Sequence, residues 1–140
     1  MSLVCYTAAQ IFDGETTHRS SALVTENGRV KAISALADLP AGAAIQDLGP
    51  GMIAPGFVDL QVNGGGGVMF NENPSVETIE TICTAHLRFG TTSLLPTLIT
   101  DTPENTAKAI AAAKDAERQG TQGFAGLHLE GPHLSQRRHG

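Results

Sequence analysis

The chain has 140 residues, and nine Lys and Arg against fourteen Asp and Glu give a net charge of −5 with His neutral. This acidic balance argues against electrostatic binding to nucleic acid or to an anionic membrane surface. Hydrophobic residues make up 41% of the sequence, which is not typical of a disordered chain, but the length falls short of the ~200 residues that a complete eight-stranded α/β barrel needs.

The two cysteines, Cys5 and Cys83, lie far apart and form no CxxC pattern, which favours free thiols in a reducing compartment. The first residues carry no positive segment ahead of the apolar ones, unlike a secretory signal. No apolar run approaches the ~18 residues needed to span a bilayer. We therefore expect a soluble protein of the cytoplasm.

Residues 1–55 contain short strand patterns separated by turns. Leu23 and Val24 precede Asn27-Gly28, and the apolar segment 30–33 follows it. Asn-Gly between apolar runs predicts a β-hairpin, because both residues tolerate positive φ. Residues 40–55 are rich in Gly, Pro and Ala, and we interpret them as a linker that leaves a small β-unit.

From residue 56 onward, strand patterns over 57–62, 92–98 and 124–130 alternate with two helix patterns. Asn73 is the predicted N-cap of the first helix with Pro74 at its first position, and Gly90 ends it. Thr102 and Pro103 begin the second helix in the same way, and Gly120 closes it. The expected apolar stripes are Val76, Ile79, Cys83 and Leu87 in the first helix and Ala107, Ile110 and Ala111 in the second. This alternation of strands and helices predicts a parallel sheet.

The strand over residues 57–62 has one polar face. Asp59, Gln61 and Asn63 alternate with apolar residues, so they point to the same side. A polar row at the C-terminal end of a parallel strand is typical of α/β enzyme sites. An edge strand with one solvent-exposed face would explain the same pattern, and the sequence leaves both interpretations open.

His128 and Glu130 share one face of the third strand pattern, opposite two leucines. An imidazole and a carboxylate side by side can both bind zinc or iron. A carboxylate that ends an apolar strand is costly unless it is paired or metal-bound. The alternative is that Glu130 reaches solvent and His128 is a hydrogen-bonded core residue.

Three further features favour structural roles. Residues 64–67 are four consecutive glycines, which are more typical of a flexible loop than of an anion cradle, since the P-loop and dinucleotide spacings are absent. His86 falls within the first helix pattern and is expected to be a surface or packing residue. The basic run of residues 137–139 is expected to be a solvated loop, although it could help attract an anionic substrate.

Residues 54–64, which read APGFVDLQVNG, resemble the first barrel strand of the amidohydrolase superfamily. The segments TTSLLPTLIT at 91–100 and GLHLEGPHL at 126–134 extend the similarity over essentially the whole chain. The full set is similar to the branch of that superfamily that acts on N-acetylglucosamine 6-phosphate. The resemblance covers only the N-terminal portion of such an enzyme.

The resemblance implies an α/β fold that begins a TIM-type (β/α)8 metal-dependent hydrolase barrel. Residues 1–55 would be the N-terminal part of a composite β-sandwich. Residues 56–140 would be the first three strands and two helices of the barrel, which is therefore incomplete. The open sheet edges of such a chain would make it marginally stable, oligomeric or dependent on a partner.

The resemblance also implies the hydrolysis of N-acetylglucosamine 6-phosphate to glucosamine 6-phosphate and acetate by a metal-activated water. Glu130 would bind a divalent metal ion, zinc or iron. Gln61 and Asn63 stand where many amidohydrolases carry two histidines, and since amides are weaker ligands, one ion per site is implied. His128 would support the metal site from beside it, and Gln61 and Asn63 would serve on the substrate side or as supporting groups.

By the same resemblance, no catalytic residue lies in this chain, because the general-base Asp is expected beyond Gly140. The complete enzyme would be a homodimer, and the isolated chain would be inactive and would bind metal weakly. Two alternatives stay open. One is another metal-dependent amidohydrolase, such as a dihydroorotase-like or allantoinase-like enzyme, against which Gln61 and Asn63 weigh. The other is a non-enzymatic truncated fragment.

Overall fold

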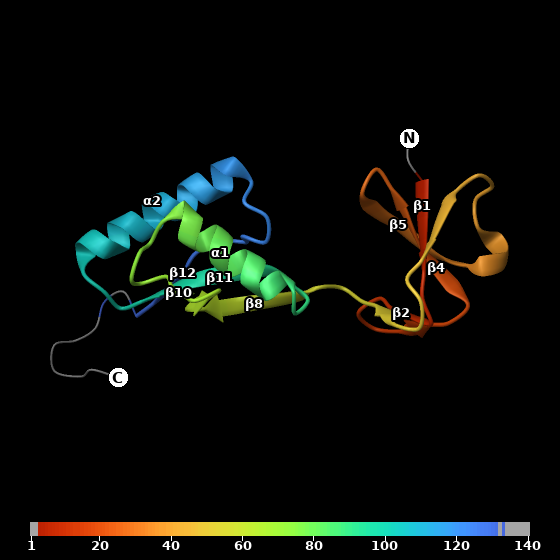
Figure 1. The fold of residues 1–140 in the computed structure, drawn as a ribbon, viewed down its shortest axis with the longest axis horizontal. Coiled ribbons are helices and arrows are strands. Elements are labelled where there is room, and N and C mark those ends of the chain that lie inside the picture. The colour runs from red at the N-terminus through yellow and green to blue at the C-terminus, as the bar shows by residue number, and fades with distance from the viewer. Residues whose placement is uncertain (1–2, 132, 134–140) are drawn as a thin grey trace. The chain divides into compact units, whose positions relative to one another are not determined.

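The computed structural model describes residues 3–131 and residue 133. The chain divides into two compact units, the first ending at Pro55 and the second beginning at Gly56 (Figure 1). Among the described residues, neither helix is long and apolar enough to cross a membrane. Each unit is described by itself below.

The first unit contains a four-stranded sheet in the order β5-β4-β1-β6. Its strands are β1 (Leu3–Thr7), β4 (Ser21–Glu26), β5 (Arg29–Ala35) and β6 (Ala44–Asp47). Strands β4 and β5 are antiparallel, and the two residues between them, Asn27 and Gly28, have φ values of 53° and 77°. The predicted hairpin is therefore confirmed, since a two-residue turn with both φ values positive matches the twist of its strands.

The predicted linker over residues 40–55 is wrong in part. It contains β6, which pairs in parallel with β1, and β7 (Met52–Ile53), which pairs in parallel with β2 (Gln10–Phe12). Strand β3 (Thr17–His18) completes a second sheet, in the order β3-β2-β7, and a single 3-10 turn spans Leu36–Asp38. Because these pairings join segments far apart in the sequence, local composition does not reveal them.

The second unit is built on three parallel strands in the order β12-β11-β8. They are β8 (Phe57–Val62), β11 (Thr91–Ile99) and β12 (His128–Glu130). Helix α1 (Val76–Leu87) follows the first strand and α2 (Pro103–Gln119) follows the second, and both appear together over one side of the sheet in Figure 1. The expected parallel pairing is therefore present.

The third strand is shorter than predicted. Residues 128–130 form β12, whereas Phe124 makes only an isolated bridge to Leu94. Gly126 lies between these two contacts, and its φ of 146° interrupts the extended backbone there.

Both helices have side-chain N-caps. Helix α1 begins after Ser75, whose hydroxyl accepts from the Thr78 N–H at 3.2 Å, so the predicted cap at Asn73 is two residues too early. Helix α2 begins as predicted, with Thr102 as the cap and Pro103 in the first turn. Gly120, at φ 68°, ends α2 in the left-handed conformation, also as predicted.

The core of the second unit lies between the sheet and the two helices. Its largest fully buried hydrophobic side chains are those of Phe70, Ile79, Ile82 and Leu94. In α1, Ile79 and Cys83 are buried as expected, but Leu87 is 43% exposed. In α2 the predicted stripe is wrong, because the buried residues are Ala109, Ala112, Ala113 and Ala116. Alanines occur on several sides of this helix, so the sequence alone does not single out the packed side.

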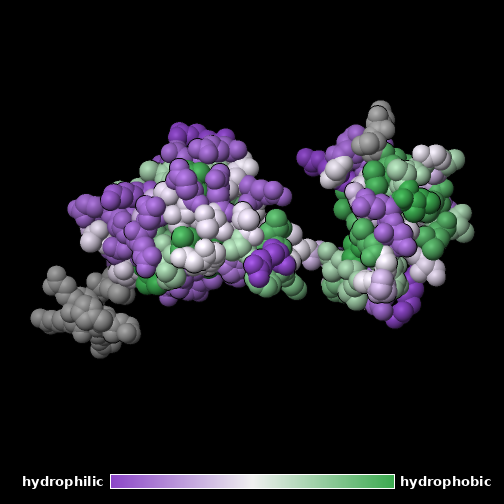
Figure 2. All heavy atoms as spheres, in the orientation of Figure 1, coloured by the Kyte–Doolittle hydropathy of each residue, from purple (hydrophilic) through white to green (hydrophobic). Residues whose placement is uncertain are grey.

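The aliphatic side chains of β8 differ in their burial. Val62 belongs to the core, whereas Val58 and Leu60 are 62% and 63% exposed. The described residues therefore cover the C-terminal end of the strand and leave the apolar side chains of Val58 and Leu60 uncovered. In the view of Figure 2, by contrast, the visible helical surface of this unit is mostly hydrophilic.

Candidate functional site

Two predicted site residues meet at the C-terminal ends of the parallel strands. Gln61 lies near the end of β8 and Glu130 at the end of β12, with β11 between the two strands. The Nε2 amide of Gln61 donates a hydrogen bond to Oε2 of Glu130 at 2.8 Å. Glu130 is exposed, and this bond fixes the direction of its carboxylate. The pairing joins residues 69 positions apart, on the sheet edge where α/β enzymes place their chemistry.

His128 lies two residues before Glu130 in β12 and is half-buried. Its Nδ1 is 2.8 Å from the backbone oxygen of Leu60. A carbonyl oxygen only accepts, so Nδ1 carries the hydrogen in this contact. This contact fits the hydrogen-bonded histidine of the alternative interpretation, and it also fits a supporting group beside a metal site.

No hydrogen bond joins the Asn63 side chain to these residues in the described part of the chain. Its Oδ1 atom is buried and lacks a hydrogen-bond partner there. Asp59, the third polar residue of the predicted face, accepts from the Gln61 backbone N–H at 3.2 Å. The roles of Gln61, Asn63, His128 and Glu130 stay predictions.

Thr97 supports the same strand ends, and sequence reasoning missed it. Pro96 cannot donate to the sheet, and the register between β8 and β11 shifts between Leu94 and Pro96. The fully buried Thr97 hydroxyl accepts from the Val62 N–H at 3.0 Å and donates to the Leu95 carbonyl at 3.1 Å. The proline inside a strand pattern is the signal that could have revealed this irregularity.

Thr100 was also missed, and it holds the backbone of the predicted metal ligand. Its hydroxyl lies 3.1 Å from the Glu130 carbonyl oxygen and 2.7 Å from that of Gly131. The preceding residue, Ile99, is the register partner of Glu130 in the sheet. The end of β12 is therefore attached to the end of β11 by a side chain as well as by sheet pairing.

A second polar group, Asn71, Asp101 and Asn105, lies next to Thr100. The amides of Asn71 and Asn105 each donate to Oδ2 of Asp101 at 2.8 Å, and the Thr102 N–H donates to Oδ1 at 2.7 Å. These donors, with the Asn105 amide first, lower the pKa of Asp101 below its ordinary value. The carboxylate therefore stays ionised at neutral pH.

The four glycines at residues 64–67 do not form the flexible loop that we expected. Strands β9 (Gly64–Gly65) and β10 (Val68–Met69) make a small hairpin packed on α1. A Cβ atom on Gly65 would lie 2.9 Å from the ring of His86, and one on Gly66 would lie 2.9 Å from the Thr81 methyl. The glycines thus allow close approach to α1, and His86, whose Nε2 lies 3.1 Å from the Gly64 oxygen, is a packing residue as predicted.

The described residues fit a divalent metal ion only in part. They contain no cluster of three or more His, Cys, Asp or Glu side chains that could hold one. The Glu130 carboxylate at a strand end is a suitable single ligand, whereas the Gln61 amide turns its donor side toward that carboxylate. The other ligands would have to come from outside these residues, and the basic run at 137–139 lies outside the described part of the chain.

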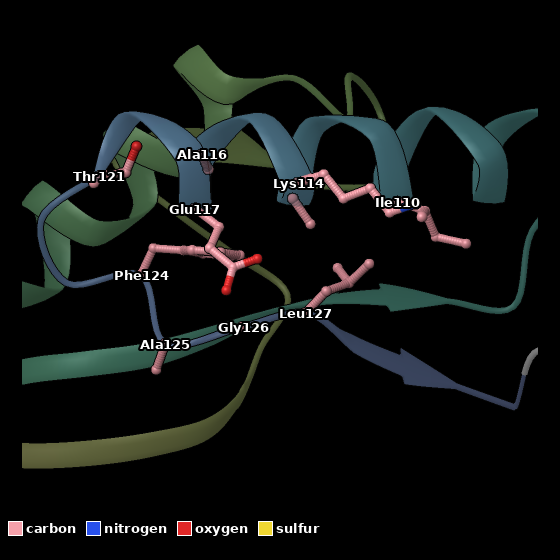
Figure 3. A pocket seen from close by; sticks show the side chains of 11 residues that line it. Ile110, Lys114, Ala116, Glu117, Thr121, Phe124, Ala125, Gly126 and Leu127 are labelled. Atoms are coloured by element: carbon pink, nitrogen blue, oxygen red, sulfur yellow. The ribbon is translucent and has the colours of Figure 1, made fainter.

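A cavity of about 310 Å³ lies between α2 and the segment that leads into β12 (Figure 3). It is lined by Ile110, Lys114 and Glu117 of the helix and by residues 124–127 of the segment. Figure 3 shows the Glu117 carboxylate and the Leu127 side chain directed into this space. None of the four predicted site residues lines it, so this cavity is separate from the polar strand ends.

Comparisons with known proteins identify relatives of the chain. Residues 52–138 match the model of the amidohydrolase family. N-acetylgalactosamine-6-phosphate deacetylase of Shewanella sp. (strain ANA-3) is 48% identical over 90 residues, which cover 64% of this chain and 23% of that protein. N-acetylglucosamine-6-phosphate deacetylase of Haemophilus influenzae is 39% identical over 117 residues, which cover 84% of this chain and 31% of that protein.

A solved structure shows the same arrangement. The crystal structure of N-acetylglucosamine-6-phosphate deacetylase from Pasteurella multocida matches with a TM-score of 0.88 and 37% identity. The match covers 96% of this chain but 36% of the solved one. The chain thus spans from about a quarter to about a third of the length of these relatives.

Proposed function

The chain belongs to the amidohydrolase family, and from that membership we propose that it forms the N-terminal part of an enzyme that deacetylates N-acetylglucosamine 6-phosphate. The products would be glucosamine 6-phosphate and acetate. The Haemophilus influenzae relative and the Pasteurella multocida structure, both named for this activity, support the proposal. The observation that carries it in this chain is the meeting of Gln61 and Glu130 at the strand ends.

A second substrate is supported by a specific observation. The Shewanella relative, at 48% identity over 90 residues, is an N-acetylgalactosamine-6-phosphate deacetylase. The two sugar phosphates differ only in the configuration of one hydroxyl, and both carry the same acetamide and phosphate. N-acetylgalactosamine 6-phosphate is therefore the competing substrate, and both sugars belong in the same assay.

Glu130 is proposed to hold one divalent ion, zinc or iron. When bound, the ion would polarise the acetamide carbonyl and activate a water molecule. Gln61 orients the Glu130 carboxylate through Oε2, and Thr100 holds the Glu130 backbone. Because the amide at position 61 acts as a hydrogen-bond donor, it supports one ion per site instead of the two that paired histidines would bind.

The remaining features of the proposal follow the family resemblance. Residues 1–55 would join a composite β-sandwich, and residues 56–140 would be the first three strands and two helices of a (β/α)8 barrel. The general-base Asp would come from outside this chain. The complete enzyme is proposed to be a cytoplasmic homodimer.

The decisive experiment is a chimera in which this chain replaces the matching N-terminal third of the Haemophilus influenzae deacetylase. We expect it to release acetate from N-acetylglucosamine 6-phosphate, and we expect Glu130→Gln to lower kcat/KM by at least about a hundredfold. Glu117→Gln, which removes a carboxylate in the α2 cavity, serves as the matched control and should retain activity. The 140-residue chain alone should release no acetate.

Three outcomes would overturn parts of this proposal. Turnover of the galactosamine substrate alone would move the assignment to the second substrate. Turnover of cyclic amides in place of the sugar phosphates would favour a dihydroorotase-like or allantoinase-like enzyme. A folded chimera without turnover of any of these compounds would favour a non-enzymatic fragment.

A further inference from the structure

The geometry points to a positioning clamp, made of Asn71, Asp101 and Asn105, which fixes the end of β11 and, through Thr100, sets the place of Glu130. The clamp residues come from the loop after β10, from the connection between β11 and α2, and from the first turn of α2. In the described part of the chain, the hydrogen bond to the Glu130 carboxylate comes from Gln61 and not from these three residues. They are therefore positioning residues and not ligands. The inference rests on the proposed function of Glu130.

The side-chain amide of Asn71 makes two hydrogen bonds with the backbone of Ile99, accepting one and donating the other. Its Oδ1 accepts from the Ile99 N–H at 3.0 Å, and its Nδ2 donates to the Ile99 carbonyl at 3.0 Å. One planar amide thus pairs with a strand residue as a neighbouring strand would. Ile99 is the register partner of Glu130, so this contact fixes the β11 residue that lies beside the predicted ligand.

Asp101 and Asn105 hold that amide in place. The second hydrogen of the Asn71 amide goes to Asp101 Oδ2 at 2.8 Å, and Asn105 donates both to the same oxygen at 2.8 Å and to the Asn71 backbone oxygen at 2.9 Å. Both donor hydrogens of each amide therefore have partners. Side-chain hydrogen bonds of this kind rigidify the segments that they join.

Thr100 connects the clamp to the backbone of Glu130. It lies between Ile99 and Asp101, both of which the clamp holds, and its hydroxyl contacts the carbonyl oxygens of Glu130 and Gly131. A displacement of Thr100 would move the backbone from which the Glu130 side chain extends. Displacements of about 1 Å in such supporting residues are enough to weaken a site.

The test uses the isotopically labelled 140-residue chain and needs no turnover. Amide hydrogen exchange of Ile99 and of residues 129–131 reports the clamp, and paramagnetic broadening of residues 128–131 by Mn²⁺ reports cation binding near Glu130. Asn71→Asp places a second carboxylate against Asp101. We expect the Ile99 amide to exchange about tenfold faster and the apparent Mn²⁺ affinity to fall about threefold to tenfold.

The double variant Asn71→Asp with Asp101→Asn removes the repulsion between the two carboxylates. It does not restore the donor to the Ile99 carbonyl oxygen, so both readouts should recover only in part. Exchange and broadening that are unchanged in Asn71→Asp would overturn the clamp.

A second pair of variants keeps the test informative if Asn71→Asp does not fold. Thr100→Val keeps the shape of the side chain but removes the hydroxyl, so exchange at residues 130–131 should rise while Ile99 stays protected. Thr100→Ser keeps the hydroxyl and should resemble the parent chain. Equal behaviour of the valine and serine variants would overturn the link to Glu130.

The metal assignment is tested separately by Glu130→Gln. This variant should abolish the Mn²⁺ broadening and leave the protection of Ile99 unchanged. Broadening that persists without the carboxylate would overturn the proposed role of Glu130 as a ligand. The amide exchange results alone would then show whether the clamp holds the end of β11.

Discussion

The two units of the chain differ in how their strands pair, because the first mixes antiparallel pairs with the parallel pairs β1–β6 and β2–β7. In the first unit, β4 and β5 pair across the two-residue Asn27-Gly28 turn, and their neighbour β1 is antiparallel to β4. In the second unit, all three principal strands are parallel, and each pairing bridges a helix and its connections. Parallel pairing brings the strand C-termini to one edge, where Gln61 meets Glu130. The unit with fewer local pairings is thus the one that assembles the candidate site.

The cores of the two units also differ in size. The first unit has a small cluster of Cys5, Ala22 and Val24, whereas the second has a larger cluster that includes Phe70, whose side chain is fully buried. Separate cores predict that a change in one unit leaves the other intact. Tyr6 is the only tyrosine and Trp is absent, so Tyr6 fluorescence reports the first unit. The α-helical circular dichroism signal reports the second, because α1 and α2 both lie there.

The largest expected effect comes from Phe70→Ala. Removing this fully buried ring should cost about 3–5 kcal/mol, which is comparable with the whole stability of a small unit. Urea titration should show an early loss of the helical signal with an unchanged Tyr6 transition. The matched control is Phe57→Ala, since Phe57 is 69% exposed, and it should change stability by about 0.5 kcal/mol or less. A simultaneous shift of both signals would contradict the independence of the two units.

A smaller effect is expected from Gly64→Ala in the β9–β10 hairpin. The added Cβ would overlap the backbone oxygen of Val68, which cannot rotate away, so a loss of about 1–3 kcal/mol is expected in the second unit. Gly51→Ala in the first unit is the control, because nothing lies within 4 Å of its added Cβ and its φ is not positive. Thermal unfolding followed by the helical signal measures the difference, and equal stabilities would argue against the packed hairpin.

The two buried cysteines allow the units to be compared without any substitution. Burial raises the pKa of the Cys83 thiol from 9.0 to about 11, so its thiolate fraction near neutral pH is about a hundredfold lower than in the unfolded chain. Alkylation of Cys83 in the native protein should therefore be slow. With increasing urea, mass spectrometry should show Cys5 and Cys83 becoming reactive in two separate transitions. One common transition would mean that the units unfold together.

The smallest effect concerns an exposed turn of the first unit. The His18 ring, followed by the backbone N–H groups of Thr16 and Glu15, lowers the pKa of Asp13 below its ordinary value of 3.8. A lowered pKa adds stability above about pH 3.8, and that stability is lost as the pH falls through the lowered value. Asp13→Asn should therefore lower the stability of the first unit at neutral pH, as measured by Tyr6 fluorescence. In strong acid the stabilities of the variant and the parent chain should become equal. Glu15→Gln, in the same turn, is the control for the loss of one surface charge.

Local sequence signals were enough to predict the features that depend on one or two neighbouring residues. The Asn27-Gly28 turn, the Thr102 cap and the Gly120 end of α2 are examples, because φ preference and capping act within a few residues. The parallel order of the second unit also followed from the alternation of strands and helices. In the site, alternation placed Gln61 and Glu130 on polar faces, and the structure joins them directly.

Features that depend on distant partners could not be predicted in this way. The pairing of β6 with β1 sits in a stretch whose Gly and Pro content suggested a linker. The role of the glycines at 64–67 depends on the His86 ring and the Thr81 methyl, both on α1. Asn71 and Asn105 are 34 residues apart, and no spacing rule connects them. Side-chain hydrogen bonds between remote segments are set by the folded backbone, so they appear only once the structure is known.

The donor bond from Gln61 has a consequence for how such a site could change during evolution. An imidazole at position 61 could replace the amide hydrogen that Glu130 now receives with a ring N–H. That nitrogen would then be engaged with the acid, and only the other ring nitrogen would be left to bind a metal ion. A histidine at this position would therefore have to serve both groups at once.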